Sequence, residues 1–192
     1  MAKSISAGLM VKPALTAKTA PSMIKLSRFK QDQDGAAALE FALIAAPFFA
    51  LLFAILEVAL IFFSSALLDR AIEDASRDIR TGQTSSLTST ADDFRNEICD
   101  TIRTVMSCEN LRVDVRPIEN FNAADFTVPL TDDEEIDDSD FTFVTGGSEQ
   151  RIMVRAYYEW KLIGPGLVNG MSNMSENRRL ITSTTAFRNE PF

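Results

Sequence analysis

The chain has 192 residues, a length that suits one domain or a small domain with an attached element. It contains 27 acidic and 19 basic side chains, two cysteines and no histidine, and its formal net charge is -8. Without histidine, a Ser-His-Asp triad, a histidine-bound metal and an imidazole general base are all excluded. We therefore expect no enzyme and no cofactor. The negative charge also argues against a nucleic-acid partner, because the phosphate backbone repels an acidic surface.

The apolar residues are concentrated in one run. Residues 41–68 (FALIAAPFFALLFAILEVALIFFSSALL) contain a single charged side chain, Glu57. About 20 helical residues cross the hydrocarbon core of a bilayer, so this run is long enough to span a membrane. A removable signal sequence has a shorter apolar region, and a buried soluble helix of this hydrophobicity needs a larger protein around it. The run therefore predicts one membrane helix.

The residues before this run form a basic leader, residues 1–35. They carry six basic and two acidic side chains, a local charge of +4, which leaves -12 on the rest of the chain. The lysines are scattered, unlike the clusters of a nuclear-localisation signal or a nucleic-acid arm. Basic residues before a first membrane helix remain in the cytoplasm. We therefore expect the leader inside the cell and the acidic C-terminal part outside the inner membrane.

The helix is predicted to continue beyond the membrane as an amphipathic stem. Glycine favours the left-handed conformation that ends helices, so Thr81-Gly82 predicts the stop. Residues 36–82 then form one helix of about 45 residues. The apolar residues of the stem recur at helical spacing between charged ones, at Leu67, Leu68, Ala71, Ile72, Ala75 and Ile79.

Residues 83–192 predict a small extracytoplasmic domain of the α+β class. Its helix, residues 91–106, would be capped by Ser89 or Thr90. Alternating apolar residues predict strands at 111–116, 151–160 and 180–188, with Pro117 ending the first and a further short strand at 141–144. These strands suit an antiparallel sheet with helices on one face. The expected apolar stripe of the helix is Phe94, Ile98, Ile102 and Val105.

A motif lies where the leader meets the apolar run. Gly35 is followed by four small or apolar residues, then Glu40 and Phe41. This pattern resembles the processing site of type IV prepilins and pseudopilins. The resemblance implies that a prepilin peptidase cuts after Gly35, that Ala36 becomes the new N-terminus, and that Glu40 pairs with the amine of a neighbouring subunit. The residues alone also allow a simpler interpretation, in which Gly35 is a hinge and Glu40 is hydrated among the lipid head groups.

Several further blocks resemble the TadE-like proteins of the tight-adherence, or Flp, type IV pilus system. The resemblance implies a pseudopilin or minor-pilin assembly factor in the bacterial inner membrane, with a periplasmic domain, possible presence in the pilus, and other pilin-like subunits and Tad machinery proteins as partners. The alternatives are an uncleaved single-pass scaffold and a tethered periplasmic domain that binds calcium or another ligand. The matching blocks are FKQDQDGAAALEFALIAAPFFALLFAILEVALIFF, LLDRAIEDASRDIRTGQ, CDTIRTVMSCENLRVDV, AYYEWKLIGPGL and FRNEPF.

Other residues of interest allow two interpretations each. Pro47 either kinks the membrane helix or is simply tolerated there, and Glu57 is either a hydrated acid near the outer interface or a contact with a partner helix. Cys99 and Cys108 predict a disulfide in an oxidising compartment, with free buried thiols as the alternative. The acidic run at 132–140 predicts a solvated loop, since its spacing does not match a calcium-binding EF-hand. No metal site is predicted.

Overall fold

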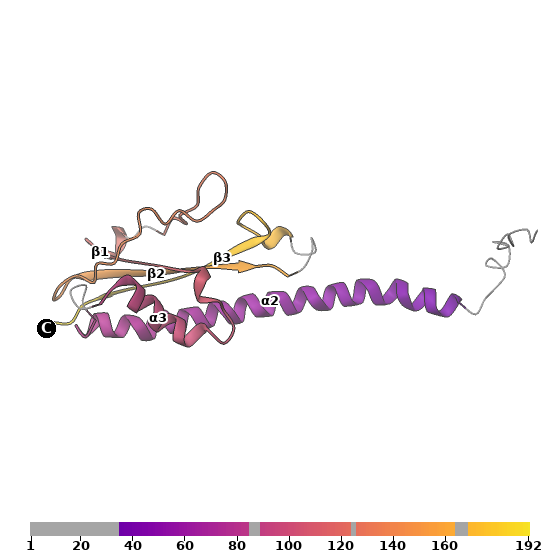
Figure 1. Ribbon diagram of the computed structural model, residues 1–192, viewed down its shortest axis with the longest axis horizontal. Helices are drawn as coiled ribbons and strands as arrows, with labels where there is room; N and C mark the ends of the chain where they lie inside the picture. Colours follow the sequence, from indigo (N-terminus) through magenta and orange to yellow (C-terminus); the bar gives the residue numbers. More distant parts are fainter. Residues whose placement is uncertain (1–34, 85–88, 124–125, 164–168) are drawn as a thin grey trace, which may run out of the picture. The chain divides into compact units, whose positions relative to one another are not determined.

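The computed structural model describes residues 35–84, 89–123, 126–163 and 169–192. The predicted leader lies outside the described residues except for Gly35. The chain divides into two compact units, Met1–Leu43 and Ile44–Phe192. The elements follow the predicted order (Figure 1): α2 (Ala36–Arg80), α3 (Ala91–Ile102), β1 (Leu111–Ile118), β2 (Arg151–Lys161) and β3 (Arg178–Arg188), with short 3-10 turns at Cys108–Asn110, Phe121–Ala123 and Asn169–Met171.

The long helix ends where the sequence predicts. The N–H of Gly82 bonds the carbonyl of Ile79, and the N–H of Gln83 bonds the carbonyl of Asp78. This pair of bonds is a Schellman motif, which requires a left-handed residue, and Gly82 has a φ of 78°. A Cβ atom added at Gly82 would lie 2.7 Å from the ring of Phe192. The position of Phe192 therefore also favours glycine at residue 82.

The second helix confirms its predicted start but ends earlier than expected. The side chain of Thr90 accepts a bond from the N–H of Asp93, and the Asp93 carboxylate accepts one from the N–H of Thr90. This capping box satisfies two backbone donors at once. The helix stops at Ile102, so Val105 does not join the apolar stripe and remains 39% exposed. Met106 is buried in its place.

The three strands form one antiparallel sheet in the order β1-β2-β3. The prediction that Pro117 ends the first strand is wrong, because β1 continues to Ile118 and Pro117 lies opposite Ile152. Proline lacks a donor, but β1 is an edge strand of this sheet and tolerates one missing bond. The strand predicted at 141–144 is reduced to a single bridge between Phe143 and Val115.

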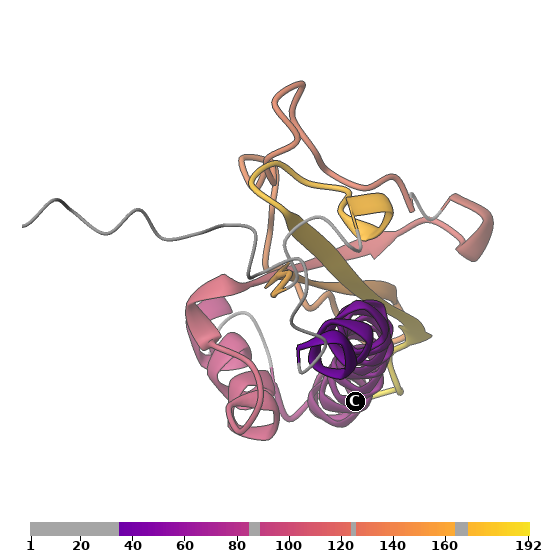
Figure 2. The same cartoon turned by 90° about the vertical axis from the view of Figure 1, so that its right-hand side faces the viewer.

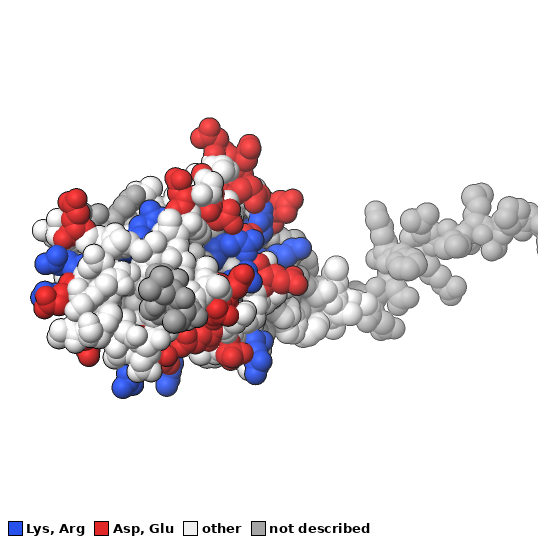
Figure 3. All heavy atoms as spheres, turned by 60° about the vertical axis from the view of Figure 1, so that its left-hand side comes forward, with Lys and Arg blue, Asp and Glu red and all other residues white. Residues whose placement is uncertain are grey.

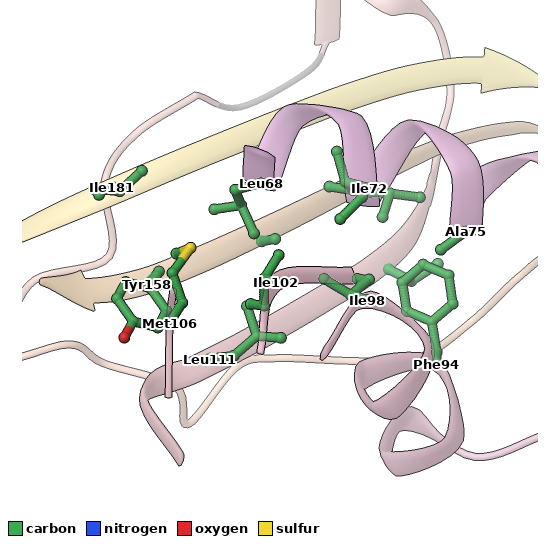
Figure 4. Packing of buried hydrophobic residues seen from close by; sticks show 14 of the residues in the cluster. Leu68, Ile72, Ala75, Phe94, Ile98, Ile102, Met106, Leu111, Tyr158 and Ile181 are labelled. Atoms are coloured by element: carbon green, nitrogen blue, oxygen red, sulfur yellow. The ribbon is translucent and has the colours of Figure 1, made fainter. Parts of the chain in front are cut away.

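Both helices pack on the same face of the sheet, as predicted (Figure 2). The stem of α2 supplies the centre of this core, since Leu68 and Ile72 are fully buried between α3 and the strands (Figure 4). The stem therefore belongs to the unit Ile44–Phe192, and the boundary predicted at residue 83 falls inside that unit. The other core residues include Ile61, Ala75, Ile79, Phe94, Ile98, Ile102, Met106, Leu111, Val154, Ala156, Tyr158 and Ile181.

The opposite face of the sheet is covered by the irregular segment 126–147. Leu130, Ile136 and Phe141 of this segment pack on a second apolar cluster formed by Tyr157, Met174 and Leu180. The rings of Phe141 and Tyr157 are stacked, with centroids 5.2 Å apart. As a result, β2 is buried on both faces, whereas its sequence alternation predicts one polar face.

A disulfide joins Cys99 in α3 to Cys108, and their Cα atoms lie 5.7 Å apart. It closes the turn that leads from α3 into β1 and limits the freedom of that turn in the unfolded chain. We expect reduction to lower the free energy of unfolding by about 2–3 kcal/mol, as the closed loop is short. Urea denaturation of the detergent-solubilised protein, with and without dithiothreitol, measures this. A Cys99→Ser/Cys108→Ser variant should have the stability of the reduced protein, and dithiothreitol should not change it. A variant as stable as the oxidised protein would contradict the prediction.

Candidate functional site

The motif residues lie at the start of α2. The helix begins at Ala36, and the N–H of Leu39 bonds the carbonyl of Gly35 at 3.1 Å. Gly35, Ala36, Glu40 and Phe41 are all exposed. A Cβ atom added at Gly35 meets no atom within 4 Å, so the described structure places no steric demand for glycine at this position. This first turn is therefore accessible to an enzyme or to a neighbouring chain.

One described helix, Ala36–Arg80, is long and apolar enough to cross a membrane. Its apolar side chains before Glu57 are largely exposed, which is unfavourable in water and typical of a lipid-facing or helix-packing surface. In Figure 3, charged side chains are spread over the domain, with acidic ones gathered on the projecting loop at the top of the view. The large exposed apolar residues of this part of α2 are Leu39, Phe41, Leu43, Ile44, Phe48, Phe49, Leu51, Leu52, Phe53, Ile55 and Leu56.

Small residues recur along this part of the helix at a spacing of four. Residues three or four apart share one face of an α-helix, and small side chains allow the backbones of two membrane helices to approach closely. Pro47 lies among them inside α2, which continues as one helix on both sides of the proline. The proline removes one backbone donor from this stretch. The small residues are Ala38, Ala42, Ala46, Ala50 and Ala54.

Glu57 makes a contact within its own chain that neither sequence-based interpretation included. Its side chain is only 5% exposed, so it is not a hydrated acid in this structure. Its Oε1 accepts a hydrogen bond from the backbone N–H of Ile163, which follows β2. The carboxylate thus links the helix to the sheet within the same chain. The sequence pattern could not show this link, because its two ends lie 106 residues apart.

The acidic run at 132–140 is more ordered than a repelling loop. Asp138 pairs with Arg112 at 3.2 Å, and Glu135 pairs with Arg178 and accepts a bond from the Ser175 hydroxyl. Hydrogen bonds from Ser175 and Arg178 hold the pKa of Glu135 below its usual value. Within the described residues, no group of three or more acidic or cysteine side chains is arranged to hold a metal ion.

A buried ionic cluster on β1 was missed by the sequence reasoning. Asp114 is fully buried and accepts hydrogen bonds from Arg116 at 2.7 Å, from Arg155 at 2.8 Å and from the N–H of Thr142 at 3.0 Å. Asp114 and Arg155 face each other in the β1-β2 register. The cluster therefore fastens segment 126–147 to the sheet. The sequence does show opposite charges at Asp114 and Arg155 in two predicted strands. Pairing them requires the alignment of β1 against β2, which the sequence does not give.

In a comparison with protein families, residues 35–77 match the family described as TadE-like protein. The match begins at Gly35 and covers most of α2. No curated protein matches the chain, and no solved structure matches it. The match falls on the segment that carries the predicted processing motif, the exposed apolar helix and the start of the stem. Residues 35–77 of this chain are thus similar to the TadE-like proteins.

Proposed function

We propose that this protein acts in the assembly of Tad-type pili as a pseudopilin-like subunit or assembly factor. The observation that carries the proposal is the coincidence of three features in α2: the family match, the glycine-to-glutamate motif at its start, and an exposed apolar surface. The proposed role needs no catalysis by this chain. Its partners would be prepilin peptidase, other pilin-like subunits and further Tad components.

The proposed mechanism is physical. The apolar part of α2 holds the subunit in the inner membrane, with the basic leader in the cytoplasm and residues 83–192 in the periplasm. Cleavage after Gly35 would place a new ammonium group on Ala36, four residues before Glu40. A carboxylate and an ammonium near each other in low dielectric stabilise one another, whereas either alone is costly. Such a pairing between subunits, together with the alanine face of α2, would align the helices in an assembly.

Processing is tested by the mass of the protein extracted from bacterial membranes. We expect the native protein to lack residues 1–35 and a Gly35→Leu variant to keep them, because a bulky side chain would not fit the peptidase site at the cleavage position. The described structure leaves open space at Gly35, so the substitution should not disturb the fold.

The matched control is Gly147→Leu, since a Cβ atom at Gly147 also meets no atom within 4 Å. This variant should be processed like the native protein. If the native protein keeps Met1 in cells with an active prepilin peptidase, it is an uncleaved scaffold and the processing proposal is wrong. Detecting the processed chain in sheared filaments or only in membranes then separates a pilus subunit from an assembly factor.

A further inference from the structure

The segment that follows β2 approaches α2 close to its exposed apolar part. Leu162 is buried in the same core as Ile61, and the N–H of Ile163 donates to Glu57. Within the unit Ile44–Phe192, Figure 1 shows the sheet over the C-terminal part of α2, with the end of β2 toward the N-terminal side of the helix. The side chain of Ile163, however, points away from the core and is 74% exposed. No other large apolar side chain among the described residues is more exposed.

The exposed apolar surface of α2 does not stop at Glu57. On the helix faces that the sheet leaves open, Phe62 and Phe63 are 70% and 56% exposed, and the first charged residue after them is Asp69. At 1.5 Å per residue, Phe63 lies about 9 Å further along the helix than Glu57. A bilayer that covers these two phenylalanines therefore also reaches the level of Ile163.

We propose that the end of β2 is a second membrane contact. Ile163 inserts at the boundary between lipid head groups and acyl chains, and the ammonium group of Lys161 faces the lipid phosphates. This inference rests on the proposed membrane placement of α2. Lys161 is exposed, and it forms no ion pair with the described residues. A lysine next to an apolar side chain is typical of such a boundary, because its stem lies along apolar surface while its charge stays hydrated.

The bond between Glu57 and Ile163 suits this position. A carboxylate that faced acyl chains would be costly, and a backbone donor together with 95% burial within the protein shields it from them. A lipid surface is favoured over a protein partner because, among the described residues, the exposed apolar area after β2 is the single side chain of Ile163, at the level of a helix surface that the proposed membrane would cover. A protein partner would need a larger complementary surface.

The test uses the full chain in phosphatidylcholine and phosphatidylglycerol vesicles. The chain's two cysteines form a disulfide, so Ile163→Cys introduces one thiol for an NBD fluorophore. Phe53→Cys labels the exposed apolar part of α2, and Val144→Cys, 43% exposed on the segment that covers the sheet, is the control. Lipids brominated near the head group quench NBD by contact, and iodide quenches it from the water.

We expect brominated lipid to reduce the fluorescence at positions 53 and 163 and to leave that at 144 unchanged. Quenching at 53 without quenching at 163 overturns the second contact but keeps the membrane helix. Protection of 163 from iodide without lipid quenching indicates a protein contact and also overturns it. If brominated lipid does not quench the fluorophore at position 53, the proposed membrane placement of α2 is wrong, and the second membrane contact is wrong as well.

Discussion

Replacing Asp114 by alanine is expected to lower the free energy of unfolding of the domain by about 3–5 kcal/mol. The substitution leaves Arg155, which is 6% exposed, without its carboxylate in the interior. It also removes the acceptor for the N–H of Thr142, so segment 126–147 keeps only its other bonds to β1, such as those between Val115 and residues 142 and 144. A loss of this size is a large share of the total stability of a small domain.

Urea denaturation of the detergent-solubilised protein measures the change through the fluorescence of Trp160, the single tryptophan of the chain. The matched control is Asp132→Ala, an exposed aspartate of the same acidic segment, which should unfold like the native protein. An Asp114→Leu/Arg155→Met variant should recover much of the loss, because it buries no unpaired charge. If the Asp114→Ala variant unfolds at the same urea concentration as the native protein, the cluster does not stabilise the domain.

The same cluster predicts how stability changes with acid. Burial alone would raise the pKa of Asp114, but hydrogen bonds from Arg116, Thr142 and Arg155 outweigh this and hold the pKa below its usual value. A carboxyl with a lowered pKa in the folded state stabilises the fold above its unfolded pKa of about 3.9. That stabilisation is lost as the pH falls through the folded pKa. The acid-dependent loss should therefore be smaller in Asp114→Ala.

The parts of the fold that sequence could predict depend on local patterns. The end of α2 follows from Gly82, the start of α3 from Thr90, and the strands from alternation of apolar residues. Each of these signals acts within a few residues of the chain. The continuation of β1 through Pro117 has a non-local reason. An edge strand tolerates a missing donor, and the position of β1 at the edge depends on the order of the strands in the sheet, which no local pattern predicts.

The parts that sequence could not predict involve distant segments. The burial of Glu57 depends on a return of the chain at Ile163, and the Asp114-Arg155 pair depends on the register of β1 against β2. The second buried face of β2 depends on segment 126–147, which has no periodic pattern. For the same reason, the acidic run alone predicts a solvated loop, since its partners Arg112 and Arg178 come from distant segments.

Truncating Ile72 to alanine is expected to destabilise the whole domain by about 2–5 kcal/mol. Ile72 is fully buried between α3 and the sheet, and the cavity left behind would be lined by side chains from both. The loss would show that the stem is part of the domain core and not a spacer between the membrane and an independent domain. Urea denaturation followed by Trp160 fluorescence measures it.

The matched control for Ile72→Ala is Phe62→Ala in the same helix. Phe62 is 70% exposed, so removing its larger side chain should change the stability of the domain by no more than about 0.5 kcal/mol. Equal effects of the two substitutions would contradict a core role specific to the stem. If the prediction holds, a chain that begins at residue 83 should fail to unfold cooperatively, since it lacks Leu68, Ile72 and Ile79. The stem and the domain would then move as one body in the proposed assembly.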